Sequence, residues 1–317
     1  MYIHLHWHSH YSLLEWIGKV PSIISKAKEL WYDTIWLADY DGMYGIMEFM
    51  TKCIKADIKP IVGIEVQYTY QLSVLNSAYQ YIVLLAKNYT WYQNLMRLTT
   101  KASTIWLTTN NPSNKHKKMP TVDLAMLAEY SEWVIMILWW FKSYLNSLLQ
   151  NNEEIDKISE QIKLFQDIFD KDIYLEISVQ DYHKEPSIRA INDLIKQISD
   201  KNNIPMVVWT NYHYINKTDK ESFEVALSIK DGRQMTDSDR RTVSWDYYIS
   251  SPDEIKSILR MNWYEDRQID ILFANNQFVA DNINLQLPKV ERLFPKYQSP
   301  DNIETIYKEA ADDMVSN

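Results

Sequence analysis

The feature that most constrains the fold is a repeated alternation of short apolar runs with longer amphipathic segments. Strands are expected at residues 2–5, 33–37, 60–66, 81–86, 173–177 and 206–208. Helices are expected at residues 21–30, 43–56, 122–130, 141–150, 155–169 and 186–200. The strand segments are apolar at consecutive positions, which is typical of strands buried on both faces. Repeated strand–helix units predict a parallel sheet covered by helices, and this many units favour a barrel.

The pattern changes after about residue 214, where helical segments are separated by irregular ones. The run Ser-Pro-Asp-Glu at 251–254 predicts a helix start, because a serine cap accepts hydrogen bonds from free backbone N–H groups and acidic residues favour the first turn. Another helical pattern begins at 302–314. We therefore expect an α/β barrel over residues 1–215, followed by a smaller, mostly helical part over residues 216–317.

The charge of the chain argues against DNA binding by its own surface. The net charge is −9 and the sequence pI is about 5.3, whereas phosphate contacts usually require a basic stripe. The one dense basic run, residues 115–118, lies in a polar, asparagine-rich segment and is interpreted as a solvated loop. If DNA is a partner, we expect other parts of a larger protein to hold it.

Three further features favour the cytoplasm. No uncharged apolar run of about 18 residues is present, so no membrane span is expected, and the N-terminus lacks the pattern of a signal peptide. Cys53 is the only cysteine and cannot form an internal disulfide, which is typical of a reducing compartment.

Four histidines alternate near the N-terminus, at His4, His6, His8 and His10. Alternate residues of a strand point to the same side, so histidines at the end of a barrel strand can converge on one metal ion. Imidazole nitrogens suit zinc, iron and manganese. A single histidine would more often be an ordinary polar residue, but four with this period favour a present or ancestral metal site.

Other candidate ligands lie at the ends of other expected strands: Asp39, Asp41, Glu65 and His213. Each of them, taken alone, is most simply an exposed polar residue in a loop. Carboxylates and histidines gathered at one rim of a barrel are the usual ingredients of a metal-dependent phosphoesterase, where metal ions activate water and bind phosphate oxygens. Their shared position therefore favours a metal site.

Several segments resemble, in order along the chain, the motifs of PHP (polymerase and histidinol phosphatase) domains in bacterial DNA polymerase III alpha subunits. These segments are residues 6–15, 37–45, 59–65, 84–95, 210–214 and 248–254. The segment 84–95 is of the polymerase type and is absent from typical stand-alone PHP phosphatases. The resemblance implies a distorted (βα)7 barrel with a metal site at its C-terminal rim. It also makes residues 216–317 the end of the PHP region and the start of the connection to the polymerase core.

Carried over residue by residue, the resemblance implies metal ligands at His6, His8, Asp39, Glu65 and His213. Other positions depart from the family's ligands: Tyr40, Tyr81 and Gln180 replace histidine, Trp140 replaces cysteine and Asn211 replaces aspartate. Phenols and carboxamides are poor ligands for a cluster that needs deprotonated or imidazole donors. We therefore expect phosphoesterase activity to be lost or severely reduced. At most one weakly held zinc or manganese ion is expected, and no residue is assigned as catalytic.

The resemblance also implies partners. DNA synthesis would belong to the remainder of the alpha chain, and DNA would be bound by the full-length protein. The degenerate PHP region would be structural and would dock the separate proofreading exonuclease. The alternative is a stand-alone metal-dependent phosphoesterase of the histidinol-phosphatase type, which a complete ligand set would favour.

Tryptophan often stands where members of this family carry glycine, at residues 16, 31, 91, 133, 139, 140 and 245. The chain has 5 glycines and 12 tryptophans, whereas an average glycine usage of about 7% would give about 22 glycines. Helix ends and tight turns favour glycine, because a positive φ is costly for a residue with a Cβ. We hypothesise that the source reads the codon UGA as glycine where this sequence has tryptophan. The alternative is a genuinely tryptophan-rich protein with aromatic core residues.

Overall fold

The computed structural model describes residues 3, 6–70, 72, 80–109, 120–132, 134–138, 155–243, 245–288 and 308. Its contacts divide the chain into two units, Met1–Gln286 and Leu287–Asn317, and the fold below is that of the first unit. Several predicted features lie outside the described residues: the helices at 141–150 and 302–314, most of the strand at 2–5, the basic run at 115–118, and the tryptophans at 133, 139 and 140.

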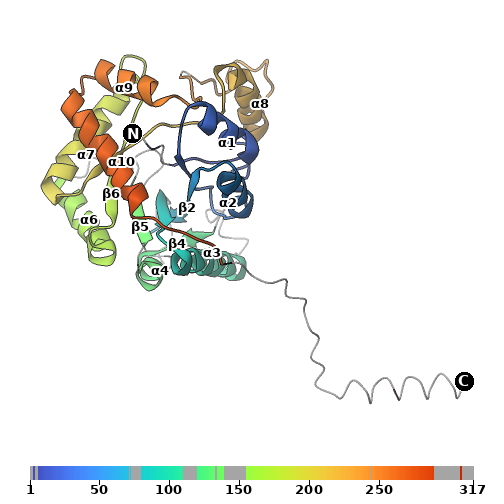
Figure 1. The fold of residues 1–317 in the computed structure, drawn as a ribbon, viewed down its shortest axis with the longest axis vertical. Helices are drawn as coiled ribbons and strands as arrows, with labels where there is room; N and C mark the ends of the chain where they lie inside the picture. The colour runs from blue at the N-terminus through green and yellow to red at the C-terminus, as the bar shows by residue number, and fades with distance from the viewer. Residues whose placement is uncertain are drawn as a thin grey trace, which may run out of the picture. The chain divides into compact units, whose positions relative to one another are not determined.

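Seven strands form one curled sheet enclosed by helices (Figure 1). The strands are β1 (Thr34–Leu37), β2 (Lys59–Tyr68), β3 (Gln80–Ala86), β4 (Thr121–Val122), β5 (Val134–Leu138), β6 (Ile173–Ser178) and β7 (Met206–Trp209). Their order is β1-β2-β3-β5-β6-β7, and β4 pairs with β2. Every residue of β1 and β6 is buried, as their apolar segments predicted. Strand β5 is equally buried, but it was not predicted. The α/β barrel architecture is thereby confirmed.

Strand β3 departs from the predicted parallel sheet, since it runs antiparallel to both β2 and β5. A parallel crossover needs a dozen or more residues and usually contains a helix, and only residues 69–79 join β2 to β3. The pairs β1–β2, β5–β6 and β6–β7 are parallel. One reversed strand therefore distorts an otherwise barrel-like sheet.

The N-terminal segment lies between β1 and β7. The carbonyl oxygen of Trp7 accepts a hydrogen bond of 2.8 Å from the backbone N–H of Ala38, just beyond β1. The carbonyl oxygen of His6 accepts one of 3.1 Å from the indole of Trp209, at the end of β7. These two contacts fix His6 and its neighbours inside the barrel.

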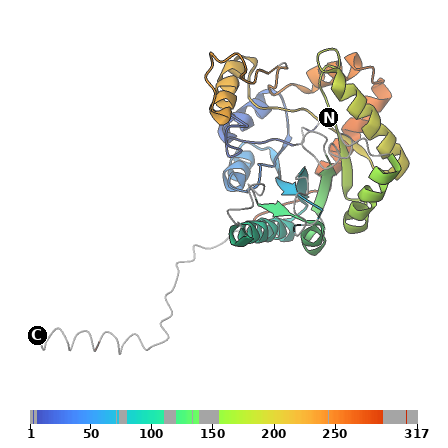
Figure 2. The ribbon, with the colours of Figure 1, turned by 180° about the vertical axis from the view of Figure 1, so that it is seen from behind.

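Helices surround the strands when the molecule is seen from either side (Figure 2). They are α1 (Val20–Glu29), α2 (Ile46–Lys55), α3 (Tyr89–Thr109), α4 (Leu124–Tyr130), α6 (Ile155–Phe169) and α7 (Pro186–Asn202). The helices predicted at 21–30, 43–56, 122–130, 155–169 and 186–200 are confirmed, with small shifts at their ends. Among the described residues, no helix combines the length and the apolar character that crossing a bilayer requires.

Two helices show where the local prediction was incomplete. Helix α4 begins after the predicted position because Thr121 and Val122 form β4, and the Asp123 side chain then caps the helix by accepting the N–H of Met126 at 2.9 Å. Helix α3 was not predicted. Its buried residues Trp91, Leu95, Leu98 and Ala102 recur at helical spacing, so the signal was present in the sequence.

The C-terminal helices of the first unit complete the barrel core. They are η1 (Lys217–Asp219), α8 (Lys220–Asp231), α9 (Pro252–Met261) and α10 (Asp266–Asp281). The helix start predicted at 251–254 is confirmed by reciprocal hydrogen bonds between Ser251 and Glu254. The amide of Asn276 in α10 bonds the carbonyl oxygens of Ile3 and Val208, both at 3.0 Å.

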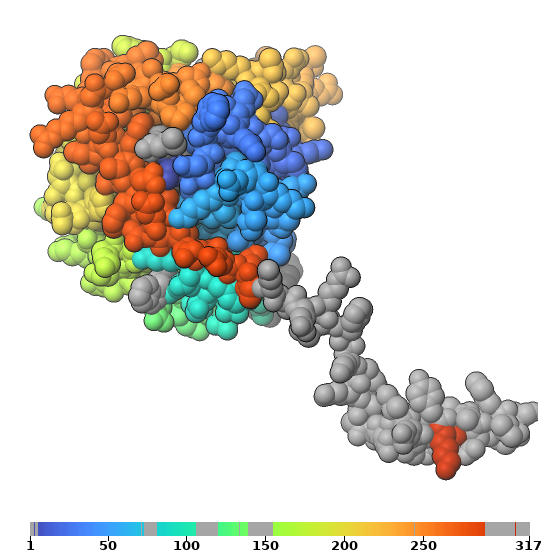
Figure 3. Space-filling view, viewed as in Figure 1, coloured from blue at the N-terminus to red at the C-terminus, as the bar shows by residue number. Residues whose placement is uncertain are grey.

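On the surface, the orange C-terminal helices lie directly beside the blue N-terminal elements (Figure 3). The ammonium of Lys59 in β2 donates a hydrogen bond of 2.7 Å to the carbonyl oxygen of Ala280 in α10. Residues beyond 215 therefore belong to the same compact unit as the barrel strands up to residue 286. The functional division at residue 215 stays a prediction.

Candidate metal centre

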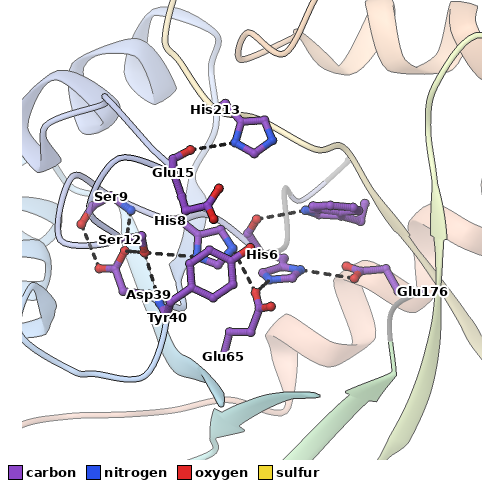
Figure 4. Close-up of polar contacts among 11 residues, drawn as sticks. His6, His8, Ser9, Ser12, Glu15, Asp39, Tyr40, Glu65, Glu176 and His213 are labelled. Carbon is purple, nitrogen blue, oxygen red and sulfur yellow. Dashed lines mark hydrogen bonds and ion pairs between the residues drawn. The ribbon is translucent and has the colours of Figure 1, made fainter. Parts of the chain in front are cut away.

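Two histidines and one glutamate converge inside the barrel (Figure 4). One carboxylate oxygen of Glu65, in β2, lies 2.9 Å from His6 Nε2 and 3.1 Å from His8 Nε2. All three side chains are buried. Among the described residues, these three form the group of histidine, cysteine and acidic side chains whose ligand atoms lie within 4.8 Å of one another. Two imidazole nitrogens and a carboxylate therefore face one small space.

A second buried carboxylate, that of Glu176 in β6, holds the other side of His6. Its Oε2 lies 3.3 Å from His6 Nδ1. Burial by itself lowers the pKa of His6, but the negative charges and hydrogen bonds of Glu176 and Glu65 outweigh burial and raise this pKa to about 9. Burial raises the pKa of Glu176, and the charge of His6 partly offsets that rise. A protonated His6 between two carboxylates is therefore favoured when no metal is bound.

The backbone of His6 is also unusual, with φ at 70°. Positive φ is uncommon outside glycine, although histidine adopts it more readily than most residues, and such strained positions cluster at functional sites. The strain is held by the hydrogen bond to Trp209 and by stacking of the two rings, whose centroids lie 5.1 Å apart.

Aromatic rings enclose His8. Tyr40 stacks on it with ring centroids 4.4 Å apart, and the indole of Trp16 lies 5.1 Å away. Burial, followed by the charge of Glu65, raises the pKa of the Tyr40 hydroxyl well above its ordinary value. Tyr40 is therefore a neutral phenol beside the site, and it lacks the charge that would make it a useful ligand.

The predicted ligand Asp39 follows β1 but is engaged elsewhere. Its Oδ1 accepts the backbone N–H of Ser9 at 2.6 Å and the hydroxyl of Ser12 at 2.7 Å. Its Oδ2 accepts the hydroxyl of Ser9 at 2.8 Å. Burial raises the pKa of Asp39, and these hydrogen bonds act against that rise. Asp39 fixes the loop after His8, and its carboxylate lies outside the three-residue group.

The predicted ligand His213 lies beyond the end of β7 and is separated from His8 by an indole. Its Nδ1 lies 2.8 Å from the carbonyl oxygen of Glu15, and its ring stacks on Phe223 with centroids 4.7 Å apart. Trp16 stands between the two histidines, with ring centroids 5.1 Å from each. The structure therefore brings together His6, His8 and Glu65, and leaves His213 behind Trp16.

Of two further acidic residues near the centre, one was a candidate ligand in the sequence analysis and the other was not. Asp41 was considered as a ligand; its Oδ1 accepts the N–H of Gln67 at 3.2 Å, and burial raises its pKa to about 7. Glu176 was missed as a site residue. The sequence did contain a signal for Glu176. It is the single acidic residue within a strand that is buried on both faces, where a carboxylate needs a charged partner.

The donor set fits one metal ion. Two imidazole nitrogens and one carboxylate oxygen suit zinc, manganese or iron, and three protein ligands leave coordination positions for water or substrate. A ligating histidine usually donates its other ring N–H to a carboxylate, a backbone carbonyl or water, and Glu176 supplies a carboxylate at this position for His6. The second oxygen of Glu176 is buried and has no hydrogen-bond partner among the described residues.

Comparison with known proteins found similar sequences and structures. A family model described as the PHP domain matches residues 4–180. The chain is 30% identical to the DNA polymerase III subunit alpha of Borreliella burgdorferi over 261 residues, covering 80% of this chain and 22% of that protein. It is 25% identical to the same subunit of Thermus aquaticus over 316 residues, covering 95% of this chain and 24% of that protein. The chain thus spans less than a quarter of the length of these relatives.

Solved structures resemble the chain more distantly. A putative metal-dependent phosphoesterase from Bifidobacterium adolescentis aligns with a TM-score of 0.45 and 10% identity, over 82% of this chain and 96% of that one. An amidohydrolase from Chromobacterium violaceum aligns with a TM-score of 0.44 and 14% identity, over 68% of this chain and 88% of that one.

Proposed function

The chain belongs to the PHP domain family, whose model covers residues 4–180, and from this premise we propose that it is the PHP region of a bacterial replicative DNA polymerase, the alpha subunit of DNA polymerase III. The support is the similarity to alpha subunits of several bacteria over most of this chain. Because the chain spans less than a quarter of those relatives, DNA synthesis and DNA binding are assigned to the remainder of a longer protein.

We further propose that the metal centre is reduced and holds one weakly bound ion. The observation that carries this proposal is the convergence of His6 and His8 on one oxygen of Glu65, while the Asp39 carboxylate is held by Ser9 and Ser12. When bound, a zinc or manganese ion would activate water and polarise a phosphate oxygen.

The chain's own residues perform limited tasks around that ion. His6 and His8 would offer their Nε2 atoms, and Glu65 would offer the oxygen that both histidines already face. Glu176 would orient His6 through Nδ1, because a carboxylate on the distal nitrogen fixes the ring and its tautomer. Tyr40, a neutral phenol, would close one side of the centre without contributing a charge.

A structural contribution follows from the same residues. In the metal-free form, the proton on His6 places a positive charge between two buried carboxylates, and this arrangement ties the N-terminal segment to β2 and β6. The polymerase resemblance supports a second task, the docking of a separate proofreading exonuclease. Co-purification of that exonuclease with this chain is expected, and failure to associate at micromolar concentration would contradict it.

The alternative function is a stand-alone metal-dependent phosphoesterase, which the intact group of His6, His8 and Glu65 favours. The test is hydrolysis of a phosphodiester such as bis(p-nitrophenyl) phosphate with added manganese or zinc, compared between the chain and its Glu65→Gln variant. We expect no turnover above the variant. Robust turnover that Glu65→Gln abolishes would establish the alternative and contradict the reduced centre.

The assignment to a polymerase has its own test, independent of the metal. The gene is expected to continue beyond the codon of Asn317 into a long reading frame with paired catalytic aspartates of a polymerase. A stop codon directly after Asn317 would contradict the polymerase assignment and leave the metal-centre proposal intact.

A further inference from the structure

Two exposed tryptophans occupy backbone positions that suit glycine. Trp31 has φ at 61° and Trp263 has φ at 65°, so both lie in the left-handed region, where a Cβ is unfavourable. Trp31 is 83% exposed and Trp263 is 57% exposed. The exposed indole of Trp31 has little packing to offset this backbone cost. Trp263 does pack against Arg189, whose guanidinium lies 4.5 Å from its ring centroid.

The surrounding hydrogen bonds show why φ is positive at these positions. After α1, the N–H of Trp31 bonds the carbonyl of Lys28 at 3.2 Å, and the N–H of Tyr32 bonds that of Ala27 at 2.9 Å. After α9, the N–H of Trp263 bonds the carbonyl of Arg260 at 3.0 Å. The next N–H, that of Tyr264, bonds the carbonyl of Leu259 at 3.1 Å. Both endings are complete Schellman motifs, whose left-handed residue is usually glycine.

Other helices of the chain end in the same way with residues that tolerate this conformation. Gly232, with φ at 66°, ends α8 through the same pair of hydrogen bonds. Asp57, with φ at 58°, ends α2 likewise, and Asn203, with φ at 53°, ends α7. Glycine, aspartate and asparagine are the residues expected there. Trp31 and Trp263 are therefore the exceptions among these helix endings.

A third tryptophan conflicts with its surroundings in a different way. Trp16 is 4% exposed, and its indole N–H is buried without a hydrogen-bond partner among the described residues. Buried tryptophans usually find an acceptor for this N–H. The same ring fills the space between His8 and His213 in the metal centre.

We propose that residues 16, 31 and 263 are glycines in the natural protein, because its source reads the codon UGA as glycine. The composition points in the same direction, since the chain has 5 glycines and 12 tryptophans, where average usage would give roughly 22 glycines. The structure adds Trp263 to the positions that the sequence indicated. It gives no such reason at Trp91, which is buried within α3, so this proposal does not extend to every tryptophan.

The proposal changes the metal centre. With glycine at residue 16, the indole between His8 and His213 is absent, and the rim is open between the two imidazoles. The proposal that these residues are glycines does not depend on the proposed function of the PHP region.

The codons give the first test. UGA at positions 16, 31 and 263 of the source gene, with glycine in the matching peptides of the protein isolated from that source, is the expected result. UGG at positions 31 and 263 would overturn the proposal.

Thermal unfolding gives a second test that needs no source material. Relief of a left-handed Cβ should raise Tm by roughly 2–4 °C for each of Trp31→Gly and Trp263→Gly. The matched controls are Trp31→Ala and Trp263→Ala, which remove the indole but keep the Cβ, so neither should reproduce the gain. A Tm that falls on glycine substitution, or rises equally with alanine, would overturn the claim that these positions suit glycine.

Discussion

The protonation of His6 gives the most detailed prediction, and Glu176→Gln is the perturbation that tests it. In the metal-free chain, Glu176 and Glu65 raise the pKa of His6 from 6.5 to about 9 despite burial. A rise of this size corresponds to about 3 kcal/mol of differential stabilisation of the protonated form. Most of it should disappear in Glu176→Gln, because the charge of Glu176 is the largest cause that raises the pKa.

The sign of the pH dependence of stability follows from the linkage between His6 protonation and folding. Between pH 6.5 and about 9 the folded state holds the His6 proton and the unfolded state releases it, so the free energy of unfolding falls as pH rises through this window. The stabilisation is present in full below pH 6.5 and is lost above about pH 9. In Glu176→Gln the fall over the same window should be markedly smaller.

The assay is urea unfolding of chelator-treated protein at pH values from 6 to 10, with an NMR titration of the His6 ring as the direct readout. Glu160→Gln, which removes an exposed acid of α6, is the matched control and should keep the wild-type profile. A folded-state His6 that titrates near 6.5, or a profile that Glu176→Gln leaves unchanged, would refute the reasoning.

Three further predictions concern the metal centre and its surroundings. Metal binding must displace the His6 proton, so the apparent Kd for manganese should fall about tenfold per pH unit between pH 7 and 9; isothermal titration calorimetry that finds no pH dependence would contradict this. Trp16→Gly should tighten manganese binding by about tenfold or more, because it opens the path to His213. Trp16→Phe keeps an aromatic ring in this space and should not tighten binding. Equal affinities for manganese in the two variants would exclude a blocking indole. Burial raises the pKa of Asp41 to about 7, so the folded state holds this proton more tightly and stability is lost as pH rises from about 4 to 7. Asp41→Asn should therefore gain up to about 4 kcal/mol at pH 8 relative to pH 4, since asparagine also suits its φ of 52°; urea unfolding that finds equal gains at the two pH values would argue against a buried, uncharged Asp41.

Local patterns predicted the elements of this fold better than their pairing. The strand at 33–37 and the helix at 155–169 follow from apolar runs and helical spacing, and both are present as β1 and α6. The reversal of β3 depends on the short connection 69–79, which limits the chain to an antiparallel return. That constraint comes from the length of a loop, and hydrophobic periodicity does not report it.

The metal centre was predictable to the extent that strand ends meet. His6, His8 and Glu65 converge, but Glu65 lies within β2, which continues to Tyr68, and not at the strand end that was predicted. The positions of Asp39 and His213 depend on side chains that no spacing rule includes, namely the serine hydroxyls and the Trp16 indole. The raised pKa of His6 likewise depends on Glu176, which only the folded sheet brings opposite it.

The central claim is a reduced centre that holds one ion on His6, His8 and Glu65. Elemental analysis of the purified chain after equilibrium dialysis against manganese or zinc, read as the excess over the dialysis buffer, tests it most directly. The account predicts about one ion per chain in the wild type and none in Glu65→Gln, with both proteins folded by circular dichroism. Two or more ions per chain, or an unchanged metal content in Glu65→Gln, would contradict it.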